Sequence, residues 1–225
     1  MVRTVPTRYP EAAVTDRAAL DRLLDGALVA HVGFVADDHP VVLPTAIVRA
    51  GDRILVHGST GSRWMRQLAT GVAVSVAVTA VDGLIVARSA YESSVRYRSA
   101  VKLPNSTALS GPAQLAALET VTEGLLPGRT REVRAPLARE NAATLVLALP
   151  IETWSMKVSD GWSQDGTDDV AGPAWAGFVP LHTSYGEPEP APDLGPGRSV
   201  PDSVRALGEA SCDWLPTGCR TADLS

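Results

Sequence analysis

The stretch LVAHVGFVADDHPVVLPTAIVRAGDRILVHGS, residues 28–59, decides the fold class. It consists of short runs rich in Val, Ile and Leu, separated by residues 37–40 (DDHP) and 50–53 (AGDR). Both separators carry residues that favour turns, whereas β-branched residues favour strands. The stretch therefore predicts three antiparallel strands in a meander.

Short helices are expected on either side of this meander. Residues 18–26 place leucines on one face, and Thr15 or Asp16 before them suits an N-cap. Residues 60–69 and 112–124 predict two further short helices with one apolar side each. Helices of this length suit the decoration of a β-structure better than a helical bundle.

More strands are expected over residues 72–79, 84–89, 144–149 and 151–158, with a turn at 81–83. Regularly spaced turn signals between short strands predict a mainly β fold, an antiparallel barrel of six strands with flanking short helices. The chain lacks a βαβ rhythm and lacks the glycine-rich motifs GxGxxG and GxxxxGK[ST]. Rossmann and P-loop folds are therefore not expected.

Composition narrows the class of protein further. The chain has 225 residues, 45% of them hydrophobic, which is enough for a sizeable core. Its net charge of −5 argues against a nucleic-acid partner, which would require a basic surface. No apolar run is long enough for a membrane helix, and the N-terminal residues carry no apolar signal segment. A cytoplasmic location, with no membrane partner, is the expectation.

The composition changes after Asp160 toward Gly, Pro, Asp and Ser, and residues 183–201 are rich in Pro and Gly. We expect a folded domain over residues 1–182 and an extended C-terminal tail over residues 183–225. Both cysteines, Cys212 and Cys219, fall in that tail. Their spacing and the lack of a nearby histidine make a zinc site a poor interpretation, so free thiols are expected.

The segment LVHGSTGSRWMRQL, residues 55–68, contains the first group of candidate functional residues. A predicted strand ends in His57, Gly58 and Ser59, and a helix begins near Ser62 and Arg63. Exposed amides, hydroxyls and a guanidinium at a helix N-terminus suit a phosphate dianion. The alternative is a capped helix, with Ser59 or Thr60 as the N-cap and Arg63 in solvent. On this segment alone the capped helix is the commoner arrangement.

The second group is the segment VRYRS, residues 95–99. Alternation along a strand would send Arg96 and Arg98 to one face and Tyr97 and Ser99 to the other. Such a strand suits a planar cofactor, and it equally suits a solvated edge strand. His31, within an apolar run, is expected to be a core residue. No spacing typical of a metal site or of a catalytic triad is present.

Three segments together resemble a known family. They are residues 21–68, residues 78–99 (VTAVDGLIVARSAYESSVRYRS) and the late pair ALPIETWSMKVSDG and WAGFVPL. They are similar to the flavin-nucleotide-binding, nitroimidazole-resistance-type branch of the pyridoxamine 5′-phosphate oxidase-like split β-barrels. The resemblance covers residues 5–205, and the HGSxxSR and YRS elements carry most of its specificity.

The resemblance implies a six-stranded split β-barrel that forms a homodimer, with FMN in clefts between the subunits. Pro44 and Thr45 would border the isoalloxazine, and Tyr97, Arg98 and Ser99 would reach the flavin from the same or the other subunit. The residues implied to hold the ribityl phosphate are His57, Gly58, Ser59, Ser62 and Arg63. Lys157 and Trp175 are further candidates on the closing strands. With the resemblance added, the phosphate site becomes the favoured interpretation of residues 57–63.

The function implied is an FMN-dependent oxidoreductase that acts on a small organic molecule, with Arg96 or Arg98 binding a substrate carboxylate or stabilising negative charge at the flavin. Alternatives are a flavin-binding protein without catalytic activity, and a split barrel that uses F420 or haem. The chain departs from the branch at Pro104, where an uninterrupted hydrophobic strand is usual, and at residues 92–96 before the tyrosine. Both departures lie beside the expected flavin face and favour a specialised site.

Overall fold

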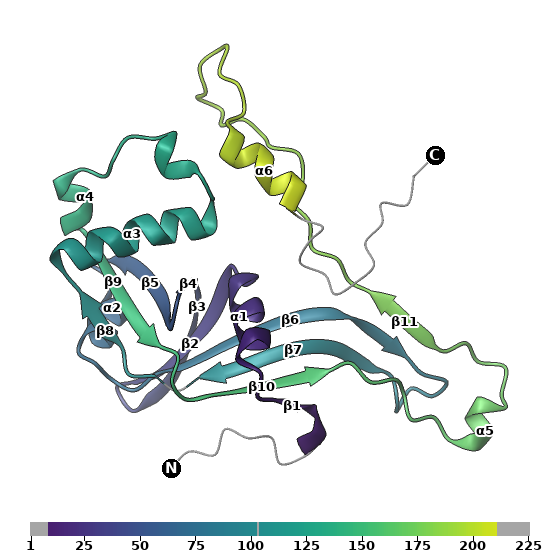
Figure 1. The fold of residues 1–225 in the computed structure, drawn as a ribbon. Coiled ribbons are helices and arrows are strands. Elements are labelled where there is room, and N and C mark those ends of the chain that lie inside the picture. The colour runs from purple at the N-terminus through teal and green to yellow at the C-terminus, as the bar shows by residue number, and fades with distance from the viewer. Residues whose placement is uncertain (1–8, 103, 211–225) are drawn as a thin grey trace.

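The computed structural model describes residues 9–102 and 104–210 (Figure 1). The helices are α1 (Arg17–Asp25), α2 (Arg63–Ala69), α3 (Gly111–Leu125), α4 (Ala138–Ala142), α5 (Thr167–Val170) and α6 (Asp202–Ala210), with 3-10 turns η1 (Pro10–Ala12) and η2 (Arg129–Arg131). The strands are β1 (Ala13–Val14), β2 (Val29–Ala36), β3 (His39–Ala46), β4 (Val48–Ala50), β5 (Arg53–Ser59), β6 (Ser75–Val86), β7 (Ser94–Lys102), β8 (Thr107–Leu109), β9 (Thr144–Pro150), β10 (Trp154–Ser159) and β11 (Gly177–Pro180).

These strands form two antiparallel sheets. The first sheet has seven strands in the order β1-β10-β7-β6-β2-β3, with β11 also paired to β6. The second sheet has four strands in the order β4-β5-β9-β8. The β6–β7 hairpin extends away from the second sheet toward β11 and α5, while α3 and α4 lie at the opposite end (Figure 1). A mainly β, antiparallel fold with short helices is confirmed, whereas a count of six strands is not.

The three-strand meander predicted over residues 28–59 is wrong in one respect. β2 and β3 form a hairpin in the first sheet, but β4 and β5 form a separate hairpin in the second sheet. The chain changes sheet at Ile47, whose side chain is buried in the core and whose amide donates to Leu28 O at 3.2 Å. Burying Ile47 between the sheets stabilises this crossing more than continuing one flat ribbon would.

The turn predicted at residues 81–83 is also wrong. β6 runs through it as one strand, with a register shift between Val81 and Gly83. Gly83 has φ +152°, and a Cβ built on it would lie 2.3 Å from the carbonyl oxygen of Val179 in β11. Glycine here permits a bulge and a close approach of another backbone, rather than a hairpin turn. β2 pairs with residues 75–77 and β11 with residues 83–86, so both share the β6 edge that β7 leaves open.

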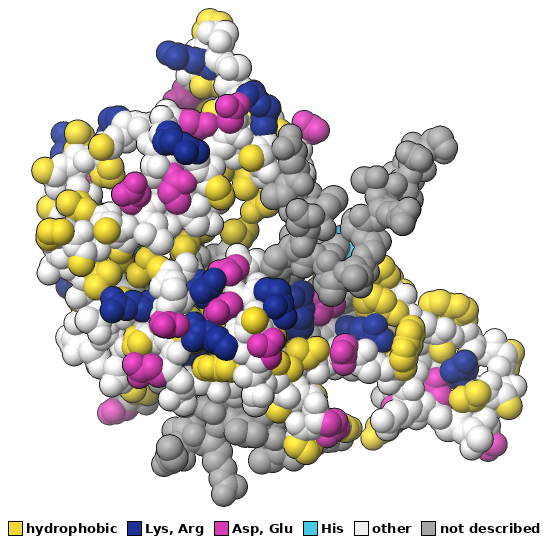
Figure 2. Space-filling model, in the orientation of Figure 1, with side chains coloured by type: hydrophobic (Ala, Val, Ile, Leu, Met, Phe, Trp, Pro, Cys, Tyr) yellow, Lys and Arg dark blue, Asp and Glu magenta, His cyan; other side chains and the backbone are white. Residues whose placement is uncertain are grey.

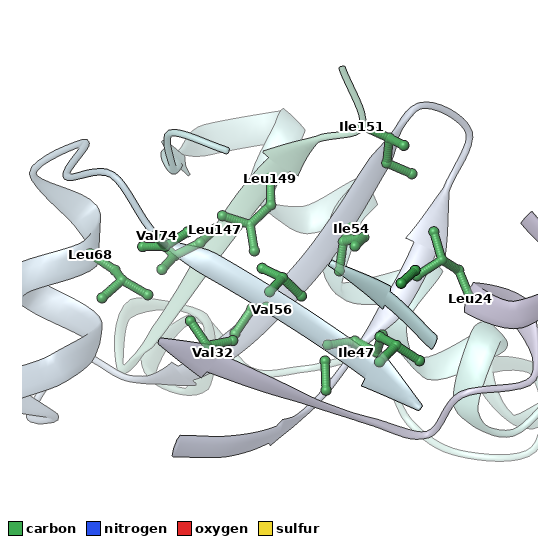
Figure 3. Close-up of a cluster of buried hydrophobic side chains, with 14 of the residues drawn as sticks. Leu24, Val32, Ile47, Ile54, Val56, Leu68, Val74, Leu147, Leu149 and Ile151 are labelled. Atoms are coloured by element: carbon green, nitrogen blue, oxygen red, sulfur yellow. The ribbon is translucent and has the colours of Figure 1, made fainter. Parts of the chain in front are cut away.

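The second sheet is buried on both faces, which explains the uninterrupted apolar run of β9. Leu147 and Leu149 pack between the two sheets, together with α1 and α2. Val146 and Ala148 point the other way and pack against α3. Figure 3 shows the inter-sheet cluster, with side chains from β2, β5, β9 and both helices converging. Strands covered on both faces lose the alternation of apolar and polar residues.

The helix prediction at the N-terminal side is confirmed in detail. α1 begins after Asp16, whose carboxylate accepts the amides of Ala18 and Ala19 at 2.9 and 3.2 Å. Asp16, not Thr15, is therefore the N-cap. Two acceptor oxygens satisfy two of the helix's unpaired amides.

The C-terminal part is more structured than the composition predicted. α6 lies within the expected tail, and its Ser203 amide donates to Glu132 Oε1 at 3.0 Å, beside η2. That hydrogen bond, with one from the Ser203 hydroxyl, holds the pKa of Glu132 below its usual value. The domain boundary at residue 182 stays a prediction. Cys212 and Cys219 lie outside the described residues.

Lys102 is a buried cation between the two sheets. It lies on β7 with 4% of its surface exposed, and its Nζ donates to Leu149 O on β9 at 3.0 Å. Burial lowers its pKa from 10.5 to about 8, although the more distant Glu152 opposes this shift. Removing the ammonium from water disfavours its charged form.

Lys102 predicts an alkaline gain in stability. Between pH 8 and 10.5 the unfolded chain holds this proton while the folded chain releases it, so the free energy of unfolding should rise with pH. Urea denaturation across this range measures the slope. Lys102→Met should reduce the slope, because the group that titrates is gone; equal slopes in both proteins would contradict the assignment.

Candidate functional site

One face of the first sheet, here called the outer face, collects several of the candidate residues. Val32, Val76, Val78, Ala100 and Met156 turn their side chains into the core. Their neighbours in each strand therefore point to the opposite side. The strand register aligns Ser155, Val101, Ala77, His31 and Pro44 in one row across five strands.

The next rows of the outer face hold the candidates from β7 and β10. Lys157 pairs with Ser99, and Ser99 with Thr79. In the following row Ser159 pairs with Tyr97, and Tyr97 with Val81. Pro44, Ser99 and Tyr97 therefore share one face, although they are far apart in sequence. Small side chains, among them Ser155, Ala77 and Ser99, occupy much of the middle of this face.

Arg98 does not belong to the outer face. It alternates with Tyr97 and Ser99, as predicted, and makes a two-pronged ion pair with Asp82, with Nη2–Oδ1 at 2.6 Å and Nε–Oδ2 at 3.0 Å. Its side chain is 16% exposed. Such a bidentate pair is a strong, geometrically fixed interaction. Thr45 also points away from the outer face, because it alternates with Pro44 and pairs with the buried Ala30.

Arg96 is held by aromatic rings instead of facing a ligand. Its guanidinium lies 4.7 Å from the ring centroid of Trp162 and 4.6 Å from that of Phe178. Its Nε donates to Gly161 O at 3.4 Å. The two cation–π contacts stabilise this position. The expectation that Arg96 or Arg98 binds a substrate carboxylate therefore loses its geometric basis.

The second group of candidates surrounds the turn between β5 and α2. Ser59 Oγ accepts the Gly61 amide at 3.0 Å, and Thr60 donates its amide to Ala143 O at 2.9 Å. Ser62, not Ser59 or Thr60, is the N-cap residue of α2, and its hydroxyl makes no capping bond. The hydroxyl of Ser62 thus remains available at the surface of the turn.

Arg63 and Arg66 have different tasks at this turn. Arg63 reaches Asp37 in the β2–β3 turn at 2.7 Å, and both side chains are at least 75% exposed. Arg66 donates from Nη1 to the carbonyls of Thr60 and Gly61 at 3.0 and 2.8 Å. The sequence predicted a role for Arg63 but not for Arg66. A hydrogen bond from a helix back to the preceding turn has no characteristic sequence pattern apart from helical spacing. An exposed pair such as Arg63–Asp37 contributes little stability.

Gly58 and His57 place α2 relative to this turn. A Cβ on Gly58 would lie 3.0 Å from Met65 Cγ, so α2 packs directly on the backbone of β5. His57 precedes it and is half-buried. The turn residues thus belong to the second sheet and α2, whereas Pro44, Tyr97 and Ser99 belong to the first sheet. The structure brings together the members of each group but places the groups on different sheets.

A pocket of about 580 Å³ lies at the edge of the outer face. Tyr97 and Lys157 line it, together with η1, β1 and residues 158–164. Of these, the sequence marked Tyr97 and Lys157, while the N-terminal arm and Trp162 carry no motif that would reveal them. No cluster of three or more His, Cys, Asp or Glu side chains suited to a metal ion occurs among the described residues. Within that same part of the chain, no helix is both long and apolar enough to span a bilayer.

Known proteins resemble this chain in sequence and in fold. The family model described as pyridoxamine 5′-phosphate oxidase matches residues 16–158, more than half of the chain. The chain belongs to the pyridoxamine 5′-phosphate oxidase-like family. No curated protein matches it.

Two solved structures are similar over most of their length. The FAD and haem binding protein from Mycobacterium smegmatis is 47% identical, with a TM-score of 0.86 over 88% of this chain and 97% of that one. The flavocytochrome Anf3 from Azotobacter vinelandii is 34% identical, with a TM-score of 0.84 over 91% and 96%. A putative 5-nitroimidazole antibiotic resistance protein from Bacteroides thetaiotaomicron shares the fold at 16% identity, with a TM-score of 0.54 over 65% and 86%.

Arg66→Ala should loosen the β5–α2 turn. Loss of both hydrogen bonds to the Thr60 and Gly61 carbonyls removes what holds the turn against α2. Hydrogen–deuterium exchange should quicken at the amides of residues 60–62. Arg22→Ala is the matched control, because it removes an exposed ion pair with Asp16 away from this turn; unchanged exchange in Arg66→Ala would show that the turn is held by other contacts.

Proposed function

We propose that the protein is a flavin-dependent oxidoreductase acting on a small organic molecule, with flavin bound between the two subunits of a homodimer. The observation that carries the proposal is the outer face, where Pro44, Ser99 and Tyr97 align around a floor of small side chains. Small side chains leave room for a planar ring system above the sheet. Membership of the family adds the cofactor class. Bound flavin would supply hydride or electron transfer.

The chain's own residues have separate tasks in this proposal. The Ser59 and Ser62 hydroxyls and the Arg63 guanidinium would hold the phosphate. Pro44 and Ser99 would border the ring, and Lys157, next to Ser99 in the register, would favour negative charge near it. Because the two groups lie on different sheets, one subunit would supply the phosphate turn and the other part of the ring site. Arg98 and Thr45, which point away from the outer face, would not contact the flavin in this proposal.

Exposed valines support the dimer. The outer side of β2 and β3 exposes Val29, Val35 and Val42, with Val42 62% exposed, and β6 adds Val81. An apolar surface of this kind on a soluble protein marks an interaction site. Hydrophobic side chains also gather at the surface on the arm formed by the ends of β6, β7 and β11 (Figure 2). A second copy that covers these strands would complete the flavin site.

We propose FAD as the flavin, with FMN, which the sequence resemblance implies, as the alternative. The FAD and haem binding protein of M. smegmatis shares 47% of its residues with this chain. The two flavins share the isoalloxazine and the ribityl phosphate, so the residues above suit either one. Their masses differ by an adenosine monophosphate unit, and release by denaturation distinguishes them.

The purified protein should be yellow and should release one flavin per chain on denaturation. Ser62→Ala combined with Arg63→Ala should lower occupancy roughly tenfold or more, because two phosphate partners are lost. Arg53→Met, an exposed cation on β5 outside the site, is the control. Absorbance before and mass spectrometry after denaturation measure both quantities. Colourless protein without releasable flavin would end the proposal.

Val42→Asp should weaken the dimer and flavin binding together. The carboxylate would have to be buried at the subunit interface, while in the isolated chain this position is solvent-exposed. Analytical ultracentrifugation gives the oligomeric state and absorbance the flavin content. Full flavin occupancy in a monomeric variant would show that the site lies within one subunit.

Haem as a second cofactor is a further candidate, favoured by the likeness to a FAD and haem binding protein and to a flavocytochrome. Haem iron needs an axial side chain, most often histidine. Within the described residues, the imidazoles of His31, His57 and His182 make no hydrogen bond, so their nitrogens are available as ligands. His31 is exposed on the outer face and is not the core residue expected from its apolar neighbours. A Soret band in the absorbance spectrum of the purified protein would show that haem is bound, and its absence would count against haem.

A further inference from the structure

A pocket lies beside the outer face. Its volume of about 580 Å³ lies within the range typical of sites for small organic ligands. The floor comes from β7 and β10, one wall from Tyr9 to Val14, and the other wall from the segment that follows β10. Most of these residues lie outside the groups assigned to flavin above.

Lys157 provides the pocket with a positive charge. Its Nζ lies 5.3 Å from the ring centroid of Tyr97. Within the described residues, that ammonium has neither a hydrogen bond nor an ion pair. Among the described residues that line the pocket it is also the one Lys or Arg. A half-buried ammonium with no carboxylate partner favours an anion from outside.

The far wall presents an aromatic surface that is held in place. Trp162 is 67% exposed, and the guanidinium of Arg96 lies over its ring at 4.7 Å. Three residues further on, Asp165 is 1% exposed and pairs with Arg88 at 2.9 Å. These two contacts anchor the segment on the β6–β7 hairpin. The indole is therefore a fixed surface on which a ring can pack.

Carboxylates at the rim limit what can enter. Glu11, Glu92 and Asp160 line the pocket; Glu11 and Asp160 are exposed and Glu92 is half-buried. They repel ligands with several negative charges, such as nucleotides, more than a ligand with one. A single anionic group that reaches Lys157 gains its attraction at close range, while the rest of the ligand stays neutral.

We propose that this pocket binds a small aromatic monocarboxylate, with the carboxylate on Lys157 and the ring against Tyr97 and Trp162. The site adjoins the proposed flavin face and shares Tyr97 and Lys157 with it, but none of its contacts requires a bound cofactor. Charge and aromatic surface act together: the ammonium selects the anion, and the indole selects the ring.

Calorimetric titration of the full-length protein, as purified, with naphthoate tests the proposal. The uncharged isostere naphthamide is the matched ligand control. Naphthoate should bind at least about tenfold more tightly than naphthamide, since only the acid can pair with the ammonium. Lys157→Met should remove this preference and Lys157→Arg should keep it, while Arg53→Met, on the second sheet, should change nothing.

Trp162→Leu should weaken naphthoate and naphthamide alike, because it removes ring packing and leaves the charge. Flavin content, measured in each variant, separates this site from the proposed function: protein that lacks flavin but binds naphthoate through Lys157 supports the pocket alone. Absence of naphthoate binding, equal affinity for acid and amide, or an unchanged preference in Lys157→Met would overturn the proposal.

Discussion

The alternation of side chains in the first sheet is the constraint on which the site depends. Val32, Val76, Val78, Ala100 and Met156 must enter the core, and burial of side chains of this size stabilises the fold by about 1.5–3 kcal/mol each for the larger ones. Because a strand has a period of two, this burial also fixes what faces outward. A slip of one residue in β7 would exchange Ser99 with Ala100. It would put a polar side chain into the core and remove one from the outer face. Core and site are therefore specified by the same register.

Much of the fold follows from local signals, and its failures have physical causes. Helices α1 to α3, most of the strands from β2 to β6, and strands β9 and β10 could be predicted, with Asp16 as one of two N-cap candidates, because periodicity and capping chemistry act over a few residues. The crossing between sheets at Ile47 could not, since it depends on what Ile47 packs against across the core. Gly83 looked like a turn residue, but the need for glycine comes from β11, about a hundred residues later in the chain. α6 was missed because its anchor, Glu132, lies 71 residues before Ser203 in the sequence.

The candidate site illustrates the same division. Alternation correctly separated Arg96 and Arg98 from Tyr97 and Ser99. It could not reveal that both arginines are already neutralised or stacked, one by Asp82 and the other by two aromatic rings. Lys157 carries no motif of its own, yet it is the cation that the pocket leaves without an ion pair among the described residues. Charge type can be taken from a sequence, whereas its availability depends on neighbours that only the fold supplies.

The shared edge of β6 has a mechanical consequence. β2 and β11 pair with opposite ends of one strand, and the bulge at Gly83 lies where the pairing of β11 ends. Phe178 of β11 lies against Arg96, which also contacts Trp162. A side chain at Gly83 would push β11 outward and tilt this stack, although residue 83 itself does not line the pocket. A single added carbon atom at residue 83 would therefore be transmitted along β11. It would alter the shape of the pocket wall, which is built from residues about eighty positions later in the chain.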